Sequence, residues 1–153
     1  MNPIQTPITG KTNPTDIKEK KLKALSEFYT AFNNRDFELM QKNWLNSKEI
    51  AMDNPLGGIK RGWSDIKAVY ERIFKGEAIV YVEFYDYTII DLDGGFCAIG
   101  RERGTLTHNN KTLELAIRTS RVYKLVNNQY KQVHHHGSMD DAELLGRYQG
   151  FLN

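Results

Sequence analysis

Four long β-rich runs follow one another in the second half of the sequence: AIVYVEFYDYTII (78–90), FCAIGRERGTLT (96–107), LELAIRTSRVYKLV (113–126) and QYKQVHHHGS (129–138). Their β-branched and aromatic residues favour strands over helices. The connecting segments DLDGG, HNNK and VNN are typical turn sequences. Short turns between long runs predict antiparallel hairpins joined in a meander.

Working outward toward the N-terminus, the sequence predicts a first amphipathic helix. Asp16 and Glu19 resemble a capping box, and apolar residues recur at helical spacing from Leu22 to Phe32. The turn sequence AFNNRD (31–36) should end this helix, because asparagine favours turns over helix interiors.

Two further helices and one short strand complete the first half. The second helix is expected from about Asp36. The short strand KEIAMD (48–53) and a glycine-rich loop lead to a third helix, for which Ser64 is the expected N-cap and Gly76 the expected end. The tail DDAELLGRYQGF (140–151) has weak helical spacing and is expected to cover the sheet or a partner.

This order of elements predicts an α+β fold, because the helices come first and the long strands last, rather than alternating in βαβ units. Residues 1–15 hold three of the four prolines and are expected to form a flexible arm. Residues 16–153 then form a single domain, which suits a chain of 153 residues.

Composition excludes several classes of protein. The 21 basic and 19 acidic residues leave a net charge of +2, which predicts no nucleic-acid binding, since that needs a concentrated basic face. The single Cys97 cannot form an intramolecular disulfide or a thiolate zinc cluster. No apolar run reaches the roughly 20 residues of a membrane span, and the N-terminus has no signal core. A soluble, cytoplasmic protein is therefore expected.

Both faces of the predicted sheet carry large apolar side chains. In the run that begins at residue 78, Ile79 and Tyr81 alternate with Val80 and Val82. A chain of this length has too little helix to cover both faces. We therefore expect a homodimer, or a larger assembly, formed through the outer face of the sheet.

Several motifs resemble one superfamily. AFNNRDFELM (31–40) and SRVYKLVNNQYKQVHHHGS (120–138) resemble the association domain of calcium/calmodulin-dependent protein kinase II. MDNPLGG (52–58) followed by GWSDIKAVY (62–70) is similar to the ketosteroid isomerase segment around its catalytic acid. Together they resemble the nuclear transport factor 2-like superfamily, which includes SnoaL-like cyclases, over roughly residues 16–138.

The resemblance implies a cone-shaped fold, in which a curved antiparallel sheet wraps around the N-terminal helix and leaves a pocket at its open end. It also implies dimers or larger rings. Activity is not implied, because this fold carries many functions.

The catalytic groups of ketosteroid isomerase are missing at the matching positions. Its base position falls on Asn54, whose amide has no ionisable carboxylate, and its tyrosine and acid-donor positions fall on Phe28 and near Ser120. Asn54 shares a strand face with Met52 and should point inward, whereas Asp53 should point outward. Steroid isomerisation of that kind is therefore not predicted.

Arginines cluster on one predicted hairpin. The resemblance implies pocket arginines at Arg101 and Arg121, while pairing across the turn brings Arg101 near Arg118 or Arg121. Strand alternation puts Arg118 and Arg121 on opposite faces. An arginine that faces the cavity needs an internal glutamate or an anionic ligand, because a buried unpaired cation is costly. The alternative is pairing on the outer face with Glu83, Glu102 or Glu114.

The triplet of histidines at 134–136 places His134 and His136 on one face and His135 on the other. The resemblance puts His135 on the pocket wall, where it is the candidate proton-transfer group. Zinc or iron binding with Asp140 or Asp141 is the less favoured interpretation, because no second HxH or HxxxH motif occurs. The alternative is a polar strand end bonded to a neighbouring chain.

The sequence thus predicts a small-molecule-binding SnoaL-like protein with no metal and no cofactor. The ligand would carry an apolar ring, and would be anionic if arginines faced the cavity. Isomerase, dehydratase and cyclase activities are the enzymatic candidates, and the sequence leaves open whether the chain is an enzyme. The alternative is a non-catalytic association (hub) domain. The candidate ligand-binding residues are Trp44, Asn54, Tyr70, Arg101, Arg118, Arg121 and His135.

Overall fold

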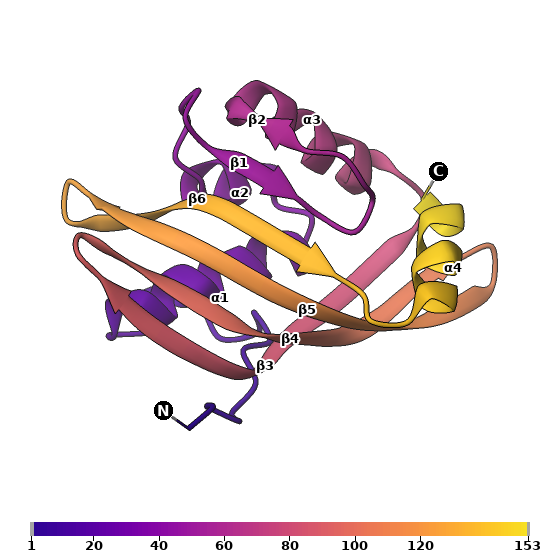
Figure 1. Ribbon diagram of the computed structural model, residues 1–153, viewed down its shortest axis with the longest axis horizontal. Coiled ribbons are helices and arrows are strands. Elements are labelled where there is room, and N and C mark those ends of the chain that lie inside the picture. Colours follow the sequence, from indigo (N-terminus) through magenta and orange to yellow (C-terminus); the bar gives the residue numbers. More distant parts are fainter. Residues whose placement is uncertain (1, 153) are drawn as a thin grey trace.

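The structure is a computed structural model that describes residues 2–152 (Figure 1). Its helices are the 3₁₀ helix η1 (Pro14–Asp16), α1 (Lys20–Asn33), α2 (Phe37–Asn43), α3 (Gly62–Lys75) and α4 (Ala142–Leu152). Its strands are β1 (Ala51–Asp53), β2 (Lys60–Arg61), β3 (Ile79–Leu92), β4 (Gly95–His108), β5 (Lys111–Val126) and β6 (Gln129–Ser138). Among residues 2–152, none of the helices is long and apolar enough to cross a bilayer.

The strands form one sheet in the order β2-β1-β6-β5-β4-β3. Consecutive antiparallel hairpins join β3 to β6, as the turn sequences predict, and β1 pairs with β6 in parallel. Figure 1 shows the long strands curving around α1, with α3 beside β1 and β2. The predicted α+β fold, a curved sheet wrapped around the first long helix, is confirmed.

The first long helix begins later than the capping-box motif predicts. Asp16 lies in η1, and α1 begins at Lys20 with Glu19 as its N-cap. The Glu19 carboxylate accepts a hydrogen bond of 2.7 Å from the backbone N–H of Leu22. That bond satisfies one of the unpaired donors of the first turn, so Glu19 takes the role expected of Asp16.

The third helix begins earlier than predicted, at Gly62, and Ser64 lies inside its first turn. Gly57 and Gly58 lie in the predicted loop, but Lys60 and Arg61 after them form β2, which pairs with β1. Backbone carbonyls then accept from the first helical N–H groups, Ile50 from Gly62 at 2.8 Å and Ser47 from Trp63 at 2.9 Å. These carbonyls accept hydrogen bonds from N–H groups that a side-chain cap would otherwise satisfy, so Ser64 is not needed as the N-cap.

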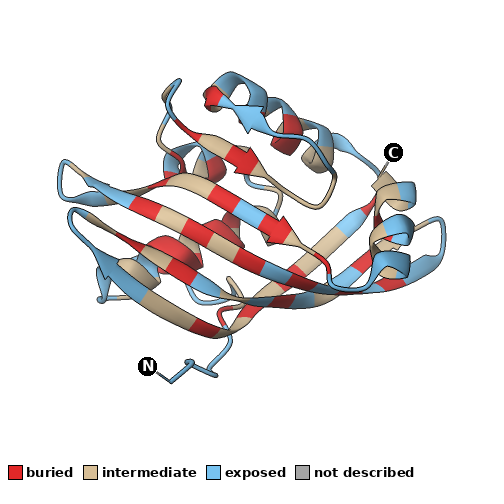
Figure 2. Cartoon of the chain, viewed as in Figure 1, coloured by how far each residue is buried: buried red, intermediate tan, exposed pale blue. Residues whose placement is uncertain are grey.

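The core lies between α1 and the concave face of the sheet. Leu25, Phe28 and Tyr29 follow the i, i+3, i+4 spacing of one helix face and are almost fully buried. Tyr29 stacks on Phe84 of β3 with ring centroids 5.6 Å apart. Figure 2 shows buried and exposed residues alternating along β4 and β5, as expected of a sheet with one covered face.

Two register shifts change which residues of the sheet point inward. In β3 the shift lies between Tyr85 and Thr88, where Asp86 has a left-handed φ of 50°. Phe84 and Tyr87 are three residues apart, yet both are buried and their rings stack at 4.9 Å. Such bulges bend a strand and re-aim its side chains.

The second shift lies in β6 and prepares the candidate site. Val122 pairs with His134, but Tyr123 pairs with Gln132, so β6 carries one extra residue. Gln132 and His135 are therefore both buried on the concave face, although an odd number of positions separates them.

The N-terminal arm, whose prolines predict flexibility, runs along the free edge of β3. Ile4 exchanges two backbone hydrogen bonds with Tyr87, and Ile8 exchanges two with Phe84. Gly10 then passes so close to α1 that a Cβ atom there would lie 2.5 Å from the backbone nitrogen of Thr30. The arm is thus held against both the sheet and the first helix.

Candidate functional site

A small cavity of about 50 Å³ lies between α1, α3, α4 and the concave face of the sheet. Its wall is largely apolar, with residues such as Phe28, Met52 and Ile117. Six polar or phenolic side chains reach it: Asn54, Tyr70, Glu102, Arg121, His135 and Tyr148. An apolar hollow with a few convergent polar groups is the usual form of a small-molecule site.

A buried ion pair forms the centre of this wall. Arg121 Nη2 lies 3.0 Å from Glu102 Oε2, and the two side chains are only 3% and 6% exposed. The Tyr29 hydroxyl donates to the same carboxylate oxygen at 2.5 Å. The Arg121 guanidinium also lies over the ring of Phe28, 3.5 Å from its centroid. The cation is thus paired, hydrogen-bonded and stacked, as a buried charge requires.

A polar network continues behind the ion pair. Arg121 Nη1 donates to Gln132 Oε1 at 2.8 Å, and Gln132 Nε2 donates to Asn43 Oδ1 at 3.1 Å. The Tyr123 hydroxyl donates to the same Asn43 oxygen at 3.0 Å. Asn43 Nδ2 in turn donates to the carbonyl of Ala24 in α1. The network fixes the orientation of Arg121, because each partner is itself held.

Burial changes the titration of the groups around the cavity. It raises the pKa of Tyr70 to about 12, and it also raises the pKa of Tyr29, to which the neighbouring Glu102 adds. Burial alone would lower the pKa of Arg121, but the oxygens of Tyr29 and Glu102 outweigh it and raise that pKa. The arginine therefore stays charged, and the phenols stay protonated at neutral pH.

His135 is a neutral imidazole on the cavity wall. Burial, followed by the charge of Arg121, lowers its pKa well below the ordinary value. Its Nδ1 lies 3.3 Å from the carbonyl oxygen of Ser120, which can only accept, so Nδ1 carries the proton and Nε2 keeps a lone pair. A Cβ at Gly137 would lie 3.2 Å from Nε2, so the glycine leaves that nitrogen unobstructed.

Four of the predicted ligand-binding residues come together in the cavity: Asn54, Tyr70, Arg121 and His135. Trp44 is buried behind them, with its ring centroid 6.3 Å from that of Tyr70, and it is not part of the wall. Tyr70 instead presents its hydroxyl to Met52 Sδ at 3.6 Å.

The other two predicted residues, Arg101 and Arg118, lie on the outer face of the sheet. They stand opposite each other across β4 and β5. Arg101 pairs with Asp86 at 3.1 Å and Arg118 with Asp140 at 2.8 Å, and about half of each arginine side chain is exposed. Only Arg121 reaches the cavity, because it differs from Arg118 by an odd number of strand positions.

His134 and His136 also lie on the outer face. His136 Nδ1 is 2.6 Å from Asp53 Oδ2, and His134 Nδ1 is 2.9 Å from the carbonyl oxygen of Ala51. Within the part of the chain that the structure describes, no group of three or more His, Cys, Asp or Glu side chains is placed to hold a metal ion.

Sequence reasoning missed three residues of the site. The sequence suggests Glu102 only as one possible partner for an arginine on the outer face, but it shares its strand face with Ala98 and Leu106, which are buried. This alternation could have placed it inside. Gln132 reaches the network only through the bulge in β6. Tyr148 comes from the tail helix, whose position the sequence left open.

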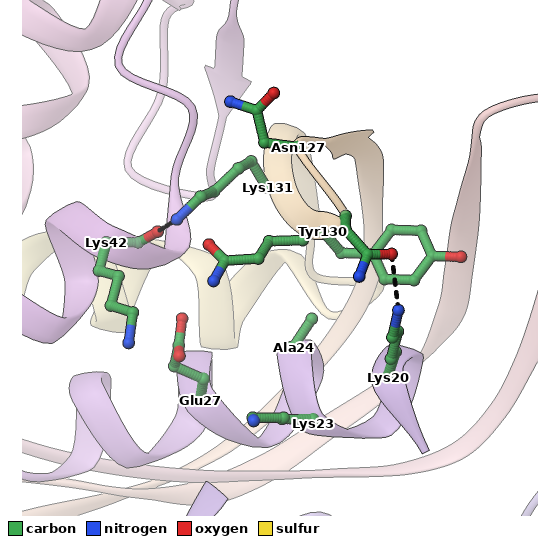
Figure 3. Close-up of a pocket in the computed structure, with 10 residues that line it drawn as sticks. Lys20, Lys23, Ala24, Glu27, Lys42, Asn127, Tyr130 and Lys131 are labelled. Atoms are coloured by element: carbon green, nitrogen blue, oxygen red, sulfur yellow. Dashed lines mark hydrogen bonds between the residues drawn. The ribbon is translucent and has the colours of Figure 1, made fainter. Parts of the chain in front are cut away.

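A larger cleft of about 310 Å³ lies on the surface between α1 and the turn that joins β5 to β6 (Figure 3). Lysine side chains dominate its lining: Lys20, Lys23, Lys42 and Lys131. Lys20 donates to Asn128 at 2.8 Å and Lys131 to the carbonyl of Lys42 at 2.6 Å. These long side chains reach solvent and do not converge on a buried point, so the inner cavity is the stronger candidate.

The sequence of this chain matches a known protein family. Residues 22–142 match the SnoaL-like domain. The chain belongs to the SnoaL-like domain family. No curated protein matches the sequence significantly.

Solved structures share the fold of this SnoaL-like chain. A candidate dehydratase of the NTF2-like family from Streptomyces avermitilis is 19% identical with a TM-score of 0.72, covering 86% of this chain and all of that one. A candidate calcium/calmodulin-dependent protein kinase type II association domain from Thiobacillus denitrificans is 24% identical with a TM-score of 0.63. The match covers 78% of this chain and 94% of that one. An NTF2-like superfamily protein from Salmonella enterica is 20% identical with a TM-score of 0.69. The match covers 78% of this chain and 90% of that one. The family match supports the predicted superfamily, whereas these structural likenesses show the shared fold alone and carry no activity to this chain.

The buried ion pair predicts a large cost for removing one partner. Glu102→Gln leaves Arg121 charged and unpaired inside this SnoaL-like domain, and should lower the free energy of unfolding by about 3–5 kcal/mol. Urea denaturation measures this loss. Glu83→Gln is the matched control, because Glu83 pairs with the half-exposed Arg103, and it should change stability little. Equal losses in the two variants would contradict a special role for the buried pair.

The neutral state of His135 predicts a pH dependence of stability. The native chain keeps His135 unprotonated, whereas the unfolded chain protonates it near its ordinary pKa of about 6.5. The unfolded state thus binds the extra proton below that pH, and stability falls on acidification.

His135→Gln should remove up to about 1.4 kcal/mol per pH unit of this slope between about pH 6.5 and 5. The measurement is urea denaturation at several pH values. His136→Gln, on the outer face, should leave the slope in place, and an unchanged slope in His135→Gln would refute the assignment.

Proposed function

We propose that this SnoaL-like protein binds an uncharged small molecule with an apolar ring in its inner cavity. The observation that carries the proposal is the Arg121–Glu102 ion pair in an otherwise apolar wall. Glu102 already neutralises the arginine, so the cavity needs no anion from the ligand. This changes the expectation of an anionic ligand, which applied to an arginine without an internal partner.

The chemistry that suits this site is proton transfer beside a developing oxyanion. His135 is neutral and offers the lone pair of Nε2, and the fixed guanidinium of Arg121 would stabilise negative charge on a ligand oxygen. Because the basicity of His135 is low, it can remove a C–H proton only next to a carbonyl whose developing enolate Arg121 stabilises. Isomerase, dehydratase or cyclase reactions of carbonyl-bearing rings use such steps.

The alternative function, a non-catalytic association domain, is less favoured. A domain that only assembles gains nothing from a buried ion pair, because a well-packed apolar replacement is often more stable. A neutral base and a charged donor that meet at one cavity are expected of a binding or catalytic site instead.

We also propose that the protein acts in the cytoplasm as a homodimer formed through the outer face of the sheet. Apolar side chains remain exposed on β3 and β4, with Ile79 61% exposed and Ile90 and Ile99 41% exposed. Ile99 lies two strand positions from Arg101, whose pair with Asp86 would border such an interface.

Ligand charge tests the proposed binding function. Acetophenone and benzoate have similar size but differ in charge. Wild-type protein should bind acetophenone more tightly than benzoate, by about tenfold or more, since a carboxylate would meet Glu102. Glu102→Gln frees Arg121 and should reverse the order, and benzoate should restore part of the stability of that variant. Isothermal titration and thermal unfolding give both results.

Proton transfer is then read from the same ligand. The protein in D₂O should catalyse exchange of the acetophenone methyl hydrogens, detected by NMR, and His135→Gln should abolish that exchange while keeping the binding. Failure of both ligands to bind wild type and Glu102→Gln would exclude the binding function. Binding with equal exchange in wild type and His135→Gln would exclude the role of the base.

Self-association gives an independent prediction. Light scattering should report twice the chain mass of 17.7 kDa. Ile99→Arg places a charge in the proposed interface and should produce a monomer, whereas Ile59→Arg, at an exposed loop residue away from the sheet face, should leave the dimer intact. A monomeric wild type would refute the interface, and a ring of many subunits would favour the association role.

A further inference from the structure

The cavity is too small for the ligand that its chemistry suits. Its volume of about 50 Å³ holds a few water molecules, whereas an apolar cavity that binds benzene measures about 150 Å³. A ring can therefore enter only if part of the wall moves. Which part moves follows from the packing of the wall elements.

Tyr148 of α4 forms part of the cavity wall. It is 8% exposed, and it is the only buried residue among those of α4 that the structure describes. Its phenol lies in the electrostatic range of Glu102 and Tyr70, at the inner side of the wall. The Tyr148 hydroxyl is not among the buried side-chain atoms that lack a hydrogen-bond partner within residues 2–152, so water can still reach it. Tyr148 thus places a largely buried phenol ring directly beside the space that a ligand would need.

The helix that carries Tyr148 is attached to the body mainly by apolar contacts and by few hydrogen bonds. Figures 1 and 2 show α4 at the end of the sheet, with exposed residues along part of the helix. One side-chain hydrogen bond joins it to the body, from Gln149 Nε2 to the carbonyl of Pro55 at 3.2 Å. The other anchors are half-buried apolar residues, Leu144, Leu145, Phe151 and Leu152.

The sequence of α4 also makes the helix unstable on its own. It has 11 residues and contains Gly146 and Gly150, where an added Cβ would meet no atom within 4 Å. Packing does not require these glycines, yet each makes the helix about fivefold less favourable than alanine would. A helix this short is marginal in water, so α4 should unfold as it leaves the body.

We infer that Tyr148 occupies the ligand's place and that α4 is a lid: a phenol-like ring enters by displacing Tyr148 and releasing α4. This inference rests on the proposed ligand-binding function and adds the route of entry and the residue that competes with the ligand. The class of ligand follows from the side chain that it replaces, an uncharged planar ring with one hydrogen-bonding oxygen.

The test uses p-cresol, which is the side chain of tyrosine as a free molecule. Binding is measured by isothermal titration, and opening of α4 by hydrogen exchange of the amides of residues 142–152 in the full-length protein. In wild type, p-cresol should bind and accelerate exchange in α4, because it displaces Tyr148. In Tyr148→Ala, p-cresol should bind about tenfold tighter or more, since the competing ring is gone, and should slow exchange in α4 by filling the gap.

A second variant keeps the cavity intact and changes only the lid. Gly146→Ala with Gly150→Ala should slow exchange in α4 and weaken p-cresol binding by the same factor, about 25-fold for two substitutions, because the ligand binds the open form. Tyr130→Ala is the control, since Tyr130 lines the lysine cleft and not this cavity, and it should leave the affinity unchanged. This pair decides the question even if Tyr148→Ala does not fold.

The outcomes separate the lid from the binding function. If p-cresol binds wild type while exchange in α4 is unchanged or slowed, or if the glycine variant binds with wild-type affinity, the lid is refuted and the binding function stands. If p-cresol binds none of the proteins, including Tyr148→Ala, the binding function fails and the lid fails with it.

Discussion

The buried pair of Arg121 and Glu102 is the constraint around which the rest of this molecule is arranged. Two charges at the centre of a small domain cost several kcal/mol each in lost hydration. That cost is tolerable only because Tyr29, Gln132 and the ring of Phe28 complete the coordination of the pair. Residues from α1, β4, β5 and β6 meet at this point, so the same contacts that stabilise the charges also join helix to sheet.

The two bulges show how the sheet meets this constraint. A strand with regular alternation could not bring both Gln132 and His135 to the concave face, and the extra residue in β6 does so. The result places a fixed cation beside a neutral imidazole. Burial first, and then the charge of Arg121, lowers the pKa of His135, and the same charge would stabilise an oxyanion on a ligand.

Much of the fold follows from the sequence, since the strands and their turns carry strong local signals. β6 spans the predicted residues, and alternation correctly separates Arg118 from Arg121 and Asp53 from Asn54. The first residue of a helix is harder to predict from the sequence. In α3, backbone carbonyls of Ser47 and Ile50 replace the side-chain cap expected at Ser64. Within the site, strand alternation could have placed Glu102 on the inner face of the sheet, but the inward position of Gln132 depends on a bulge. Tyr148 depended on where α4 docks, which no local pattern encodes.

The segment before α1 has a consequence for solubility. A long strand at the border of a sheet offers unpaired N–H and C=O groups to any other extended chain, and β3 has fourteen residues. By pairing at Ile4 and Ile8, the segment occupies part of that border itself. Truncation or a bulky fusion at this terminus would expose the edge of β3 without changing the core. The exposed edge could then act as a template for fibril growth.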